Sequence, residues 1–244
     1  RAAARVPIVT LTVTGLPFLS TEQAAARRRG QPSSGEGAVA IECDICVGHT
    51  LPQKNTALLR TYCAIDSRAK QLILAVKIWS KAAGVADSVN GTLASYSWSL
   101  LCVFFLQQCE PPVLPLLQSD ALVGERWRSH ELIDGCDTSF CGDAEEARAT
   151  LSAHNSSSVG ELLLEFFSFF GSLRFDKWAV SARLGHLRAR KAEQRKTKWR
   201  MCIEDPFELE HDLGNVISCS AAQAEITKAL REAAGALLRS DPRS

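Results

Sequence analysis

The stretch AIECDICV (residues 40–47) alternates small or apolar residues with polar ones and is rich in residues that favour β-structure. This period of two predicts a β-strand, with Asp44 on the same face as Glu42 and Cys46. A strand can hold a carboxylate rigidly, as a metal ligand requires. On this stretch alone, a solvent-facing Asp44 on an edge strand is the simpler interpretation, and the residues that follow decide between the two.

The length, composition and charge of the chain limit the classes of protein to which it can belong. The chain has 244 residues, 46% of them hydrophobic, which is enough for one large domain or two small ones with a sizeable core. The formal net charge is +1, so contact with a polyanion requires a local cluster of positive charge. No apolar run reaches membrane-spanning length, and the first residues lack a signal-peptide pattern, so we expect no membrane partner.

The nine cysteines are an odd number, and several lie in apolar runs. This pattern fits reduced thiols inside a cell better than a disulfide framework. Cys43 and Cys46 form one C-x-x-C without a second pair at zinc spacing; core packing is the simpler role, and a metal or redox role is the alternative. We expect an intracellular protein, with the cytoplasm favoured over the nucleus and the mitochondrion.

Before this strand lie another strand and an irregular segment. RVPIVTLTV (residues 5–13) is dominated by β-branched residues and predicts the first strand. Residues 15–37 contain Gly, Pro, Ser and three consecutive arginines at 27–29, which predicts a loop or hairpin insertion. Solvated side chains are the simpler role for these arginines, and RNA contact is the alternative.

From Asn55 onward the apolar pattern becomes helical. Asn55 can cap a helix over residues 56–63, and Asp66 or Ser67 can cap a second helix that ends near Gly84. The second helix is apolar nearly all round, which predicts that it is buried.

Lys77 and Lys81 interrupt this apolar helix, four residues apart on one face. Ammonium groups on a buried helix need an anion opposite them, because unpaired buried charge is costly. The alternative is that both side chains snorkel to solvent at the helix edge.

The rest of the chain is predicted to be mainly helical. The expected elements are an apolar helix from GTLASY (91–96) to about residue 108, an irregular segment over 110–157 with one short helix at 143–153, an apolar helix over 159–170, an extended piece at 175–180 and a closing helix over 221–238. Residues 183–200 carry eight lysines and arginines and one acid. They predict a basic flexible loop that touches phosphates, or else a solvated loop with no partner.

Several blocks in this order resemble the terminal uridylyltransferase and noncanonical poly(A) polymerase family, within the DNA polymerase β-like nucleotidyltransferases. The blocks are RVPIV (5–9), CDI (43–45), NTALL with Tyr62 (55–62), KIWSK (77–81), GTLASY (91–96), the apolar helix with its glycine (159–171) and EDPFE with His211 (204–211). The resemblance extends from Arg5 to about Val216, with interruptions at 15–37 and 112–157. Each block alone is weak evidence for the family, whereas the whole set in this order is highly specific to it.

The resemblance implies an α+β fold. Residues 1–54 correspond to the C-terminal part of a mixed-sheet nucleotidyltransferase domain. Residues 55–244 correspond to a mostly helical central domain, with a PAP-associated region at about 158–216, and nucleotide is expected in the cleft between the two. The implied reaction is template-independent transfer of UMP from UTP to RNA 3′-hydroxyl ends. Its implied cofactor is Mg²⁺ (or Mn²⁺), its partners are UTP and an RNA 3′ end, and we expect a monomer.

The resemblance also assigns roles to single residues. Asp44 corresponds to the third of three carboxylates that hold two Mg²⁺ ions. Lys77 and Lys81 correspond to lysines that contact the triphosphate, which explains the paired charges on an apolar helix. Ser95, at a helix start, corresponds to a hydroxyl that contacts phosphate. Tyr96 corresponds to the ring that stacks on the nucleobase.

The remaining assignments concern the sugar and the base. Asn55 and Thr56 correspond to residues near the ribose and base. Uracil presents O4 as an acceptor where adenine presents an amino donor, so a donating His211 accepts UTP and opposes ATP. Asp205 and Glu208 can accept from the uracil N3–H, or hold His211 in place. The alternative for His211 is an ordinary surface residue.

The chain departs from the family pattern before Arg5. The family's first two carboxylates follow a Gly-Ser loop as D-x-D, and nothing like this precedes Arg5. Asp44 alone cannot hold two metal ions, so we expect either missing upstream sequence, which the retained blocks favour, or a degenerate protein. Two rival functions stay open: an RNA adenylyltransferase that prefers ATP, and a catalytically inactive RNA- or protein-binding relative.

Overall fold

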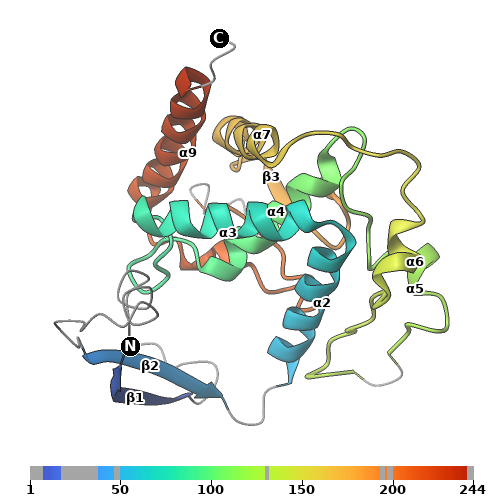
Figure 1. The fold of residues 1–244 in the computed structure, drawn as a ribbon, viewed down its shortest axis with the longest axis horizontal. Coiled ribbons are helices and arrows are strands. Elements are labelled where there is room, and N and C mark those ends of the chain that lie inside the picture. Colours follow the sequence, from blue (N-terminus) through green and yellow to red (C-terminus); the bar gives the residue numbers. More distant parts are fainter. Residues whose placement is uncertain are drawn as a thin grey trace, which may run out of the picture. The chain divides into compact units, whose positions relative to one another are not determined.

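The computed structural model describes residues 8–17, 38–46, 50–129, 132–192, 196 and 200–240. The chain divides into two compact units, Arg1–Thr50 and Leu51–Ser244. The arginine run at 27–29 lies outside the described residues. Helices and short strands occur together, which confirms the predicted α+β class (Figure 1).

The described part of the first unit is an antiparallel pair of strands. β1 (Ile8–Pro17) and β2 (Ala38–Cys46) pair with Thr10 opposite Asp44. Both predicted strands are therefore confirmed within the described residues, and Asp44 lies inside β2.

The second unit is mainly helical. Its elements are α2 (Leu51–Ile65), α3 (Ser67–Ala82), α4 (Ser95–Gln108), α5 (Asp120–Val123), α6 (Ala144–Arg148), α7 (Val159–Ser172), β3 (Trp178–Ser181), β4 (His186–Ala189), the 3-10 helix η1 (Leu213–Val216) and α9 (Ser220–Ser240). The predicted apolar and closing helices are confirmed as α4, α7 and α9. None of the described helices combines the length and the apolar character needed to span a bilayer.

Helix α4 is the centre of the core. Every residue from Ser97 to Gln107 is buried, because this helix is apolar on nearly all faces. Phe104 packs on Phe170 of α7 with ring centroids 6.4 Å apart, and further ring pairs join the same two helices. Each such pair contributes about 0.5–1.5 kcal/mol beyond the area it buries.

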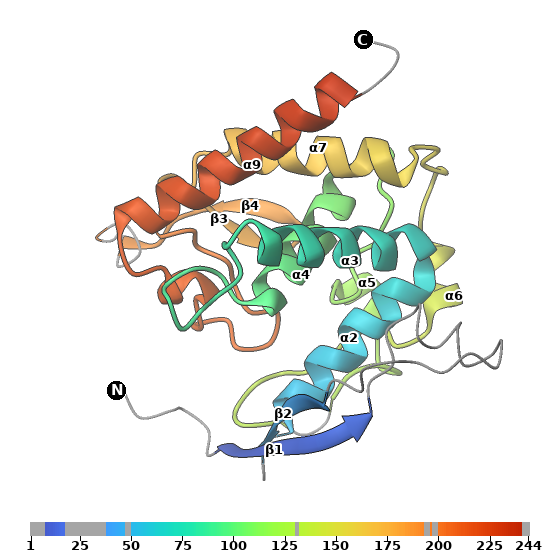
Figure 2. The ribbon, with the colours of Figure 1, turned by 60° about the vertical axis from the view of Figure 1, so that its left-hand side comes forward.

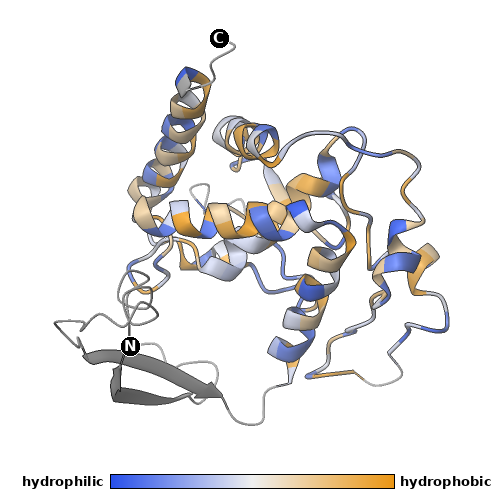
Figure 3. Ribbon diagram, in the orientation of Figure 1, coloured by the Kyte–Doolittle hydropathy of each residue, from blue (hydrophilic) through white to orange (hydrophobic). Residues whose placement is uncertain are grey.

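Helix α9 covers α7. Its buried residues Ala222, Ile226, Leu230 and Ala234 recur every fourth position, which is the pattern of a helix with one apolar side. Figure 2 shows α7 and α9 side by side, and Figure 3 shows hydrophilic and hydrophobic residues interleaved along α9.

Two details of the helix predictions are wrong. Asn55 does not cap a helix, because α2 begins at Leu51 and includes Asn55. Pro52 is compatible with the first turn of a helix, where its missing N–H has no intrahelical partner. Helix α3 is not buried all round, since the side chains of Leu74 and Ile78 are 48% and 71% exposed.

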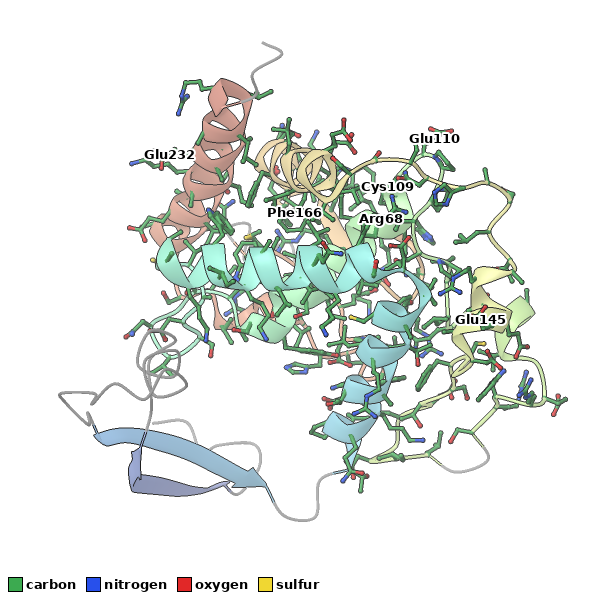
Figure 4. All side chains as sticks on the ribbon, in the orientation of Figure 1. Arg68, Cys109, Glu110, Glu145, Phe166 and Glu232 are labelled. Atoms are coloured by element: carbon green, nitrogen blue, oxygen red, sulfur yellow. The ribbon has the colours of Figure 1, made fainter. Side chains whose placement is uncertain are left out.

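Asp66 caps α3, as predicted. Its carboxylate accepts hydrogen bonds from the backbone N and the guanidinium of Arg68, at 2.8 and 2.7 Å. Arg68 also donates to the carbonyl of Ser157 at 2.7 Å, which ties α3 to the segment before α7. Burial raises the pKa of Asp66, but the hydrogen bonds from Arg68 outweigh burial and lower it overall. Figure 4 shows Arg68 close to Cys109, just beyond the end of α4.

We predict that Asp66→Ala lowers the free energy of unfolding by about 1 kcal/mol at pH 7, because α3 loses its cap. The folded pKa of Asp66 lies below its ordinary value of 3.8. Its contribution is therefore present above pH 3.8 and is lost as pH falls through the folded pKa. Thermal unfolding at pH 7 and at lower pH tests this. Asp66→Asn is the control, since it keeps the cap and removes the charge. An equal effect of Asp66→Ala at both ends of the pH range would contradict the prediction.

Candidate functional site

The loop at residues 201–216 is folded around its own carboxylates. Asp205 is 2% exposed, and its Oδ1 accepts from the backbone amides of Phe207 and Glu208 at 2.9 and 3.0 Å. A buried carboxylate is costly unless donors surround it, and here the donors come from the turn that follows it. Asp205 therefore fixes the direction of the chain through this turn.

Asp212 closes the other end of the same loop. Its Oδ1 accepts from the backbone amides of Ile203 at 3.1 Å and Gly214 at 2.9 Å. The amide of Asp205 donates across the loop to the carbonyl of His211 at 3.2 Å. The two carboxylates and this cross-loop bond hold the segment that carries His211 in one conformation.

Tyr96, Glu208 and His211 come together beside Asp205. Tyr96 lies in the first turn of α4, and its hydroxyl is shielded from solvent. Burial raises the pKa of this phenol, and the carboxylates of Asp205 and Glu208 raise it further, so the ring stays neutral. His211 Nδ1 lies 3.5 Å from Glu208 Oε2, and 35% of the His211 side chain is exposed. The cluster presents a neutral aromatic ring and an imidazole held by a carboxylate.

Lys77 and Lys81 lie on α3, one helical turn apart. Lys81 is exposed and Lys77 is half-buried, so the expectation that burial forces an anion opposite both groups is wrong. Among the residues that the structure describes, neither ammonium group forms an ion pair. Both remain available to an external anion.

Ser95 and the GTLASY block begin α4. Ser95 is the first residue of the helix and is half-buried. Gly91 has φ +84°, and a Cβ there would lie 2.3 Å from Ser218 Oγ, so the block passes against the segment that leads into α9. Glycine at this position permits both the backbone conformation and the close approach.

Asn55 and Thr56 lie in α2. Within the described residues, the Oδ1 atom of Asn55 is shielded from solvent and has no hydrogen-bond partner. An acceptor in this state is costly unless a ligand or water completes it. Thr56 is exposed, and its hydroxyl donates to the carbonyl of Pro52 at 2.8 Å.

Asp44 belongs to the first unit, in β2. The other predicted residues all belong to the second unit, on α2, α3, α4 and the 201–216 loop. No cluster of three or more His, Cys, Asp or Glu side chains suited to a metal ion occurs in the described part of the chain.

Sequence reasoning missed two residues that hold the loop. Gln118 Nε2 and Arg183 Nη1 both donate to the carbonyl oxygen of Pro206, at 3.0 and 2.9 Å. These contacts join positions 88 and 23 residues apart, and no local pattern in the sequence marks them.

The predicted basic loop is largely paired within the protein. Arg188 forms a salt bridge with Glu204, Lys191 with Glu210 at 3.0 Å, and Arg200 donates to Asn215 Oδ1 at 2.7 Å. Residues 186–189 form strand β4. The part at 186–189 is therefore a strand and not a loop, and these described cations pair with groups of the 201–216 loop; contact of the stretch with RNA stays a prediction.

Comparisons with known proteins agree with the order of these blocks. A family model described as "Cid1 family poly A polymerase" matches residues 158–211. Terminal uridylyltransferase 4 of Mus musculus is 33% identical over 214 residues, covering 86% of this chain and 12% of that protein. Poly(A) RNA polymerase cid13 of Schizosaccharomyces pombe is 32% identical over 203 residues, covering 80% of this chain and 34% of that protein.

The fold agrees with a solved structure as well. A crystal structure of the Cid1 poly(U) polymerase with Mg and 3′-dATP bound is 30% identical, with a TM-score of 0.72. The match covers 84% of this chain and 62% of that chain. The present chain spans between 12% and 34% of the length of the two curated relatives above.

We predict that Gly214→Ala lowers the free energy of unfolding by about 1–3 kcal/mol, which is the usual effect of overpacking. A Cβ at Gly214 would lie 1.8 Å from the backbone oxygen of Met201, so the loop must shift. Urea unfolding measures the change. Gly160→Ala in α7 is the matched control, because the nearest atom, Ser158 Oγ, lies 3.9 Å from the added Cβ. Equal stability of Gly214→Ala and wild type would refute this account of the loop.

Proposed function

Because the chain belongs to the family of RNA nucleotidyltransferases that includes terminal uridylyltransferases and poly(A) polymerases, we propose that it serves UMP transfer from UTP to RNA 3′-hydroxyl ends. The observation that carries this proposal is the cluster of Tyr96, Glu208 and His211 on the loop that Asp205 organises. A cytoplasmic location, a monomeric state and an RNA 3′ end as partner stay predictions.

The cluster supports a preference for uracil. A neutral ring at Tyr96 offers a surface on which a base stacks. His211 Nδ1 lies 3.5 Å from Glu208 Oε2, and in the tautomer that carries its proton on Nε2 the ring donates from that nitrogen to the base. A donor at that point accepts uracil O4 and opposes the amino group of adenine. Asp205 serves the turn through its Oδ1, which accepts from two backbone amides, and we propose its other oxygen as an acceptor for the uracil N3–H.

The phosphates are assigned to α3 and the start of α4. Lys77 and Lys81 supply two positive charges a helical turn apart, without an ion pair among the described residues. Ser95 adds a hydroxyl at the N-terminus of a 14-residue helix, where backbone N–H groups favour anions. The unpartnered Oδ1 of Asn55 is suited to accept a hydrogen bond from a ribose hydroxyl.

The described residues do not provide the donor set for two divalent ions. Asp44 is the one carboxylate that the family pattern assigns to Mg²⁺ (or Mn²⁺), and one carboxylate does not hold two such ions. We propose Asp44 as one ligand.

An RNA adenylyltransferase is the second candidate, and the match to Poly(A) RNA polymerase cid13 favours it. The two candidates differ in the role of His211, because a donor opposed to the adenine amino group is unfavourable in an enzyme that selects ATP.

We predict that His211→Ala lowers the ratio of kcat/KM for UTP to that for ATP by about 10-fold, as expected for loss of a hydrogen bond to the base. The measurement uses the protein encoded by the complete transcript, with each nucleotide alone. His186→Ala on β4 is the control, because His186 is exposed and lies outside the cluster. An unchanged ratio would remove His211 from base selection, and a wild-type preference for ATP would favour the second candidate.

We predict that Asp44→Ala abolishes nucleotide transfer and leaves UTP binding intact when binding is measured without divalent metal. The physical reason is that the carboxylate acts on the metal and not on the base or sugar. Glu42→Ala, on the same strand, is the control and should retain activity. Transfer by Asp44→Ala at the wild-type rate would refute the assignment.

A further inference from the structure

The carbonyl oxygen of Pro206 is held from two sides. Gln118 Nε2 donates to it at 3.0 Å and Arg183 Nη1 at 2.9 Å. Gln118 is 7% exposed, and the Arg183 side chain is 19% exposed. A carbonyl oxygen has two lone pairs, so these two donors complete its hydrogen-bonding capacity.

Arg183 is itself anchored by a third residue. Its Nη2 lies 3.2 Å from Asp137 Oδ2, and the other oxygen of Asp137 accepts from the backbone amide of Ser139 at 2.9 Å. Burial raises the pKa of Asp137, but the hydrogen bonds from Ser139 and the charge of Arg183 lower it overall. Asp137 thus remains an anion beside Arg183 at neutral pH. Gln118, Asp137 and Arg183 are called the Pro206 brace below.

Two of the three brace residues come from a part of the chain that interrupts the family pattern. Gln118 and Asp137 lie in the irregular segment 110–157, and Phe140 of the same segment contacts Phe207 with ring centroids 6.1 Å apart. This segment therefore contacts two consecutive residues of the turn.

The turn that the brace holds is the one that positions the candidate base-reading residues. Pro206 stands between Asp205 and Phe207, and Asp205 binds the amides of Phe207 and Glu208. Glu208 in turn holds His211 Nδ1 at 3.5 Å, and its carbonyl accepts from the His211 amide at 2.7 Å. A rotation of the Pro206 peptide plane would move Glu208 and His211 together.

We propose that Arg183 and Gln118 are positioning residues for nucleotide selection: by fixing the Pro206 carbonyl they set the placement of Glu208 and His211. This inference rests on the proposed function. It assigns a role to the interrupting segment and to the first arginine of the basic stretch, and neither residue needs to touch the nucleotide.

The experiment compares Arg183→Met, Arg183→Lys and Gln118→Leu in the protein encoded by the complete transcript. We expect Arg183→Met to raise KM for UTP by about 10-fold and to lower the UTP-to-ATP ratio of kcat/KM, with kcat changed by less than about 3-fold. Arg183→Lys keeps a cation but loses the planar fork that reaches Pro206 and Asp137 together, so an intermediate effect is expected. Because Gln118 and Arg183 share one acceptor, the double variant should be less impaired than the product of the two single effects.

Arg174→Met is the matched control. It removes an arginine that pairs with Asp176 at 2.8 Å and is 64% exposed, and it lies outside the 201–216 loop. The midpoint of thermal unfolding of each variant separates positioning from folding. Loss of stability and of kcat with an unchanged KM and an unchanged nucleotide ratio would overturn the proposal.

The proposed function and this inference fail in different ways. If the wild-type protein prefers ATP, UTP selection is refuted. In that case we expect Arg183→Met to raise KM for ATP as it would have raised KM for UTP, because the brace still positions the loop. In a protein without transfer activity, equilibrium titration with UTP replaces KM, and unchanged affinity in Arg183→Met and Gln118→Leu would again overturn the proposal.

Discussion

A buried carboxylate must be surrounded by donors, and this requirement shapes the functional part of the second unit. Asp205 is 2% exposed and meets the requirement with two backbone amides of the residues that follow it. Asp212, seven residues later, meets it with the backbone amides of Ile203 and Gly214. A loop folded in this way has one low-energy conformation, because any other would leave a charge without donors. The fixed loop is what gives His211 a defined position.

The same requirement explains the pairing of the basic stretch. Glu204 is 7% exposed, and Arg188 compensates its charge from the neighbouring strand β4. Breaking such a pair by removing one partner leaves the other charge uncompensated, at a typical cost of about 3–5 kcal/mol for fully buried pairs. The exposed pair of Lys191 with Glu210 contributes much less, because solvent screens it. Among its described residues, the stretch thus combines two partly shielded ion pairs, Arg183 with Asp137 and Arg188 with Glu204, with the exposed pair of Lys191 and Glu210.

The sequence predicted the elements whose signals are local. The apolar helix expected over 159–170 is α7, which begins with a capping box of Ser158 and Glu161, and Asp66, one of the two expected caps, begins α3. Asn55 resembles a cap, whereas α2 begins at Leu51, because Pro52 fits the first turn of a helix. The exposure of Leu74 and Ile78 on α3 was not predictable from composition, since an apolar residue is often exposed when no neighbouring element covers it.

The candidate site likewise depends partly on motifs visible in the sequence and partly on contacts between residues far apart in the chain. The meeting of Tyr96 with the 201–216 loop was expected from the family pattern, whereas Gln118 and Arg183 reach Pro206 through contacts that no spacing in the sequence encodes.

The charges then suggest how a nucleotide would be oriented in the proposed function. The ring of Tyr96 has two carboxylates beside it, while the lysines lie on a different element, α3. The two carboxylates repel a triphosphate, and the lysines attract it. A nucleotide is therefore bound favourably with its base toward the loop and its phosphates toward α3. Binding in the reverse direction would place the negatively charged triphosphate beside the two carboxylates, which would repel it. Under the proposed function, discrimination between orientations would come from the separation of charge between the two elements, and discrimination between bases from the imidazole of His211.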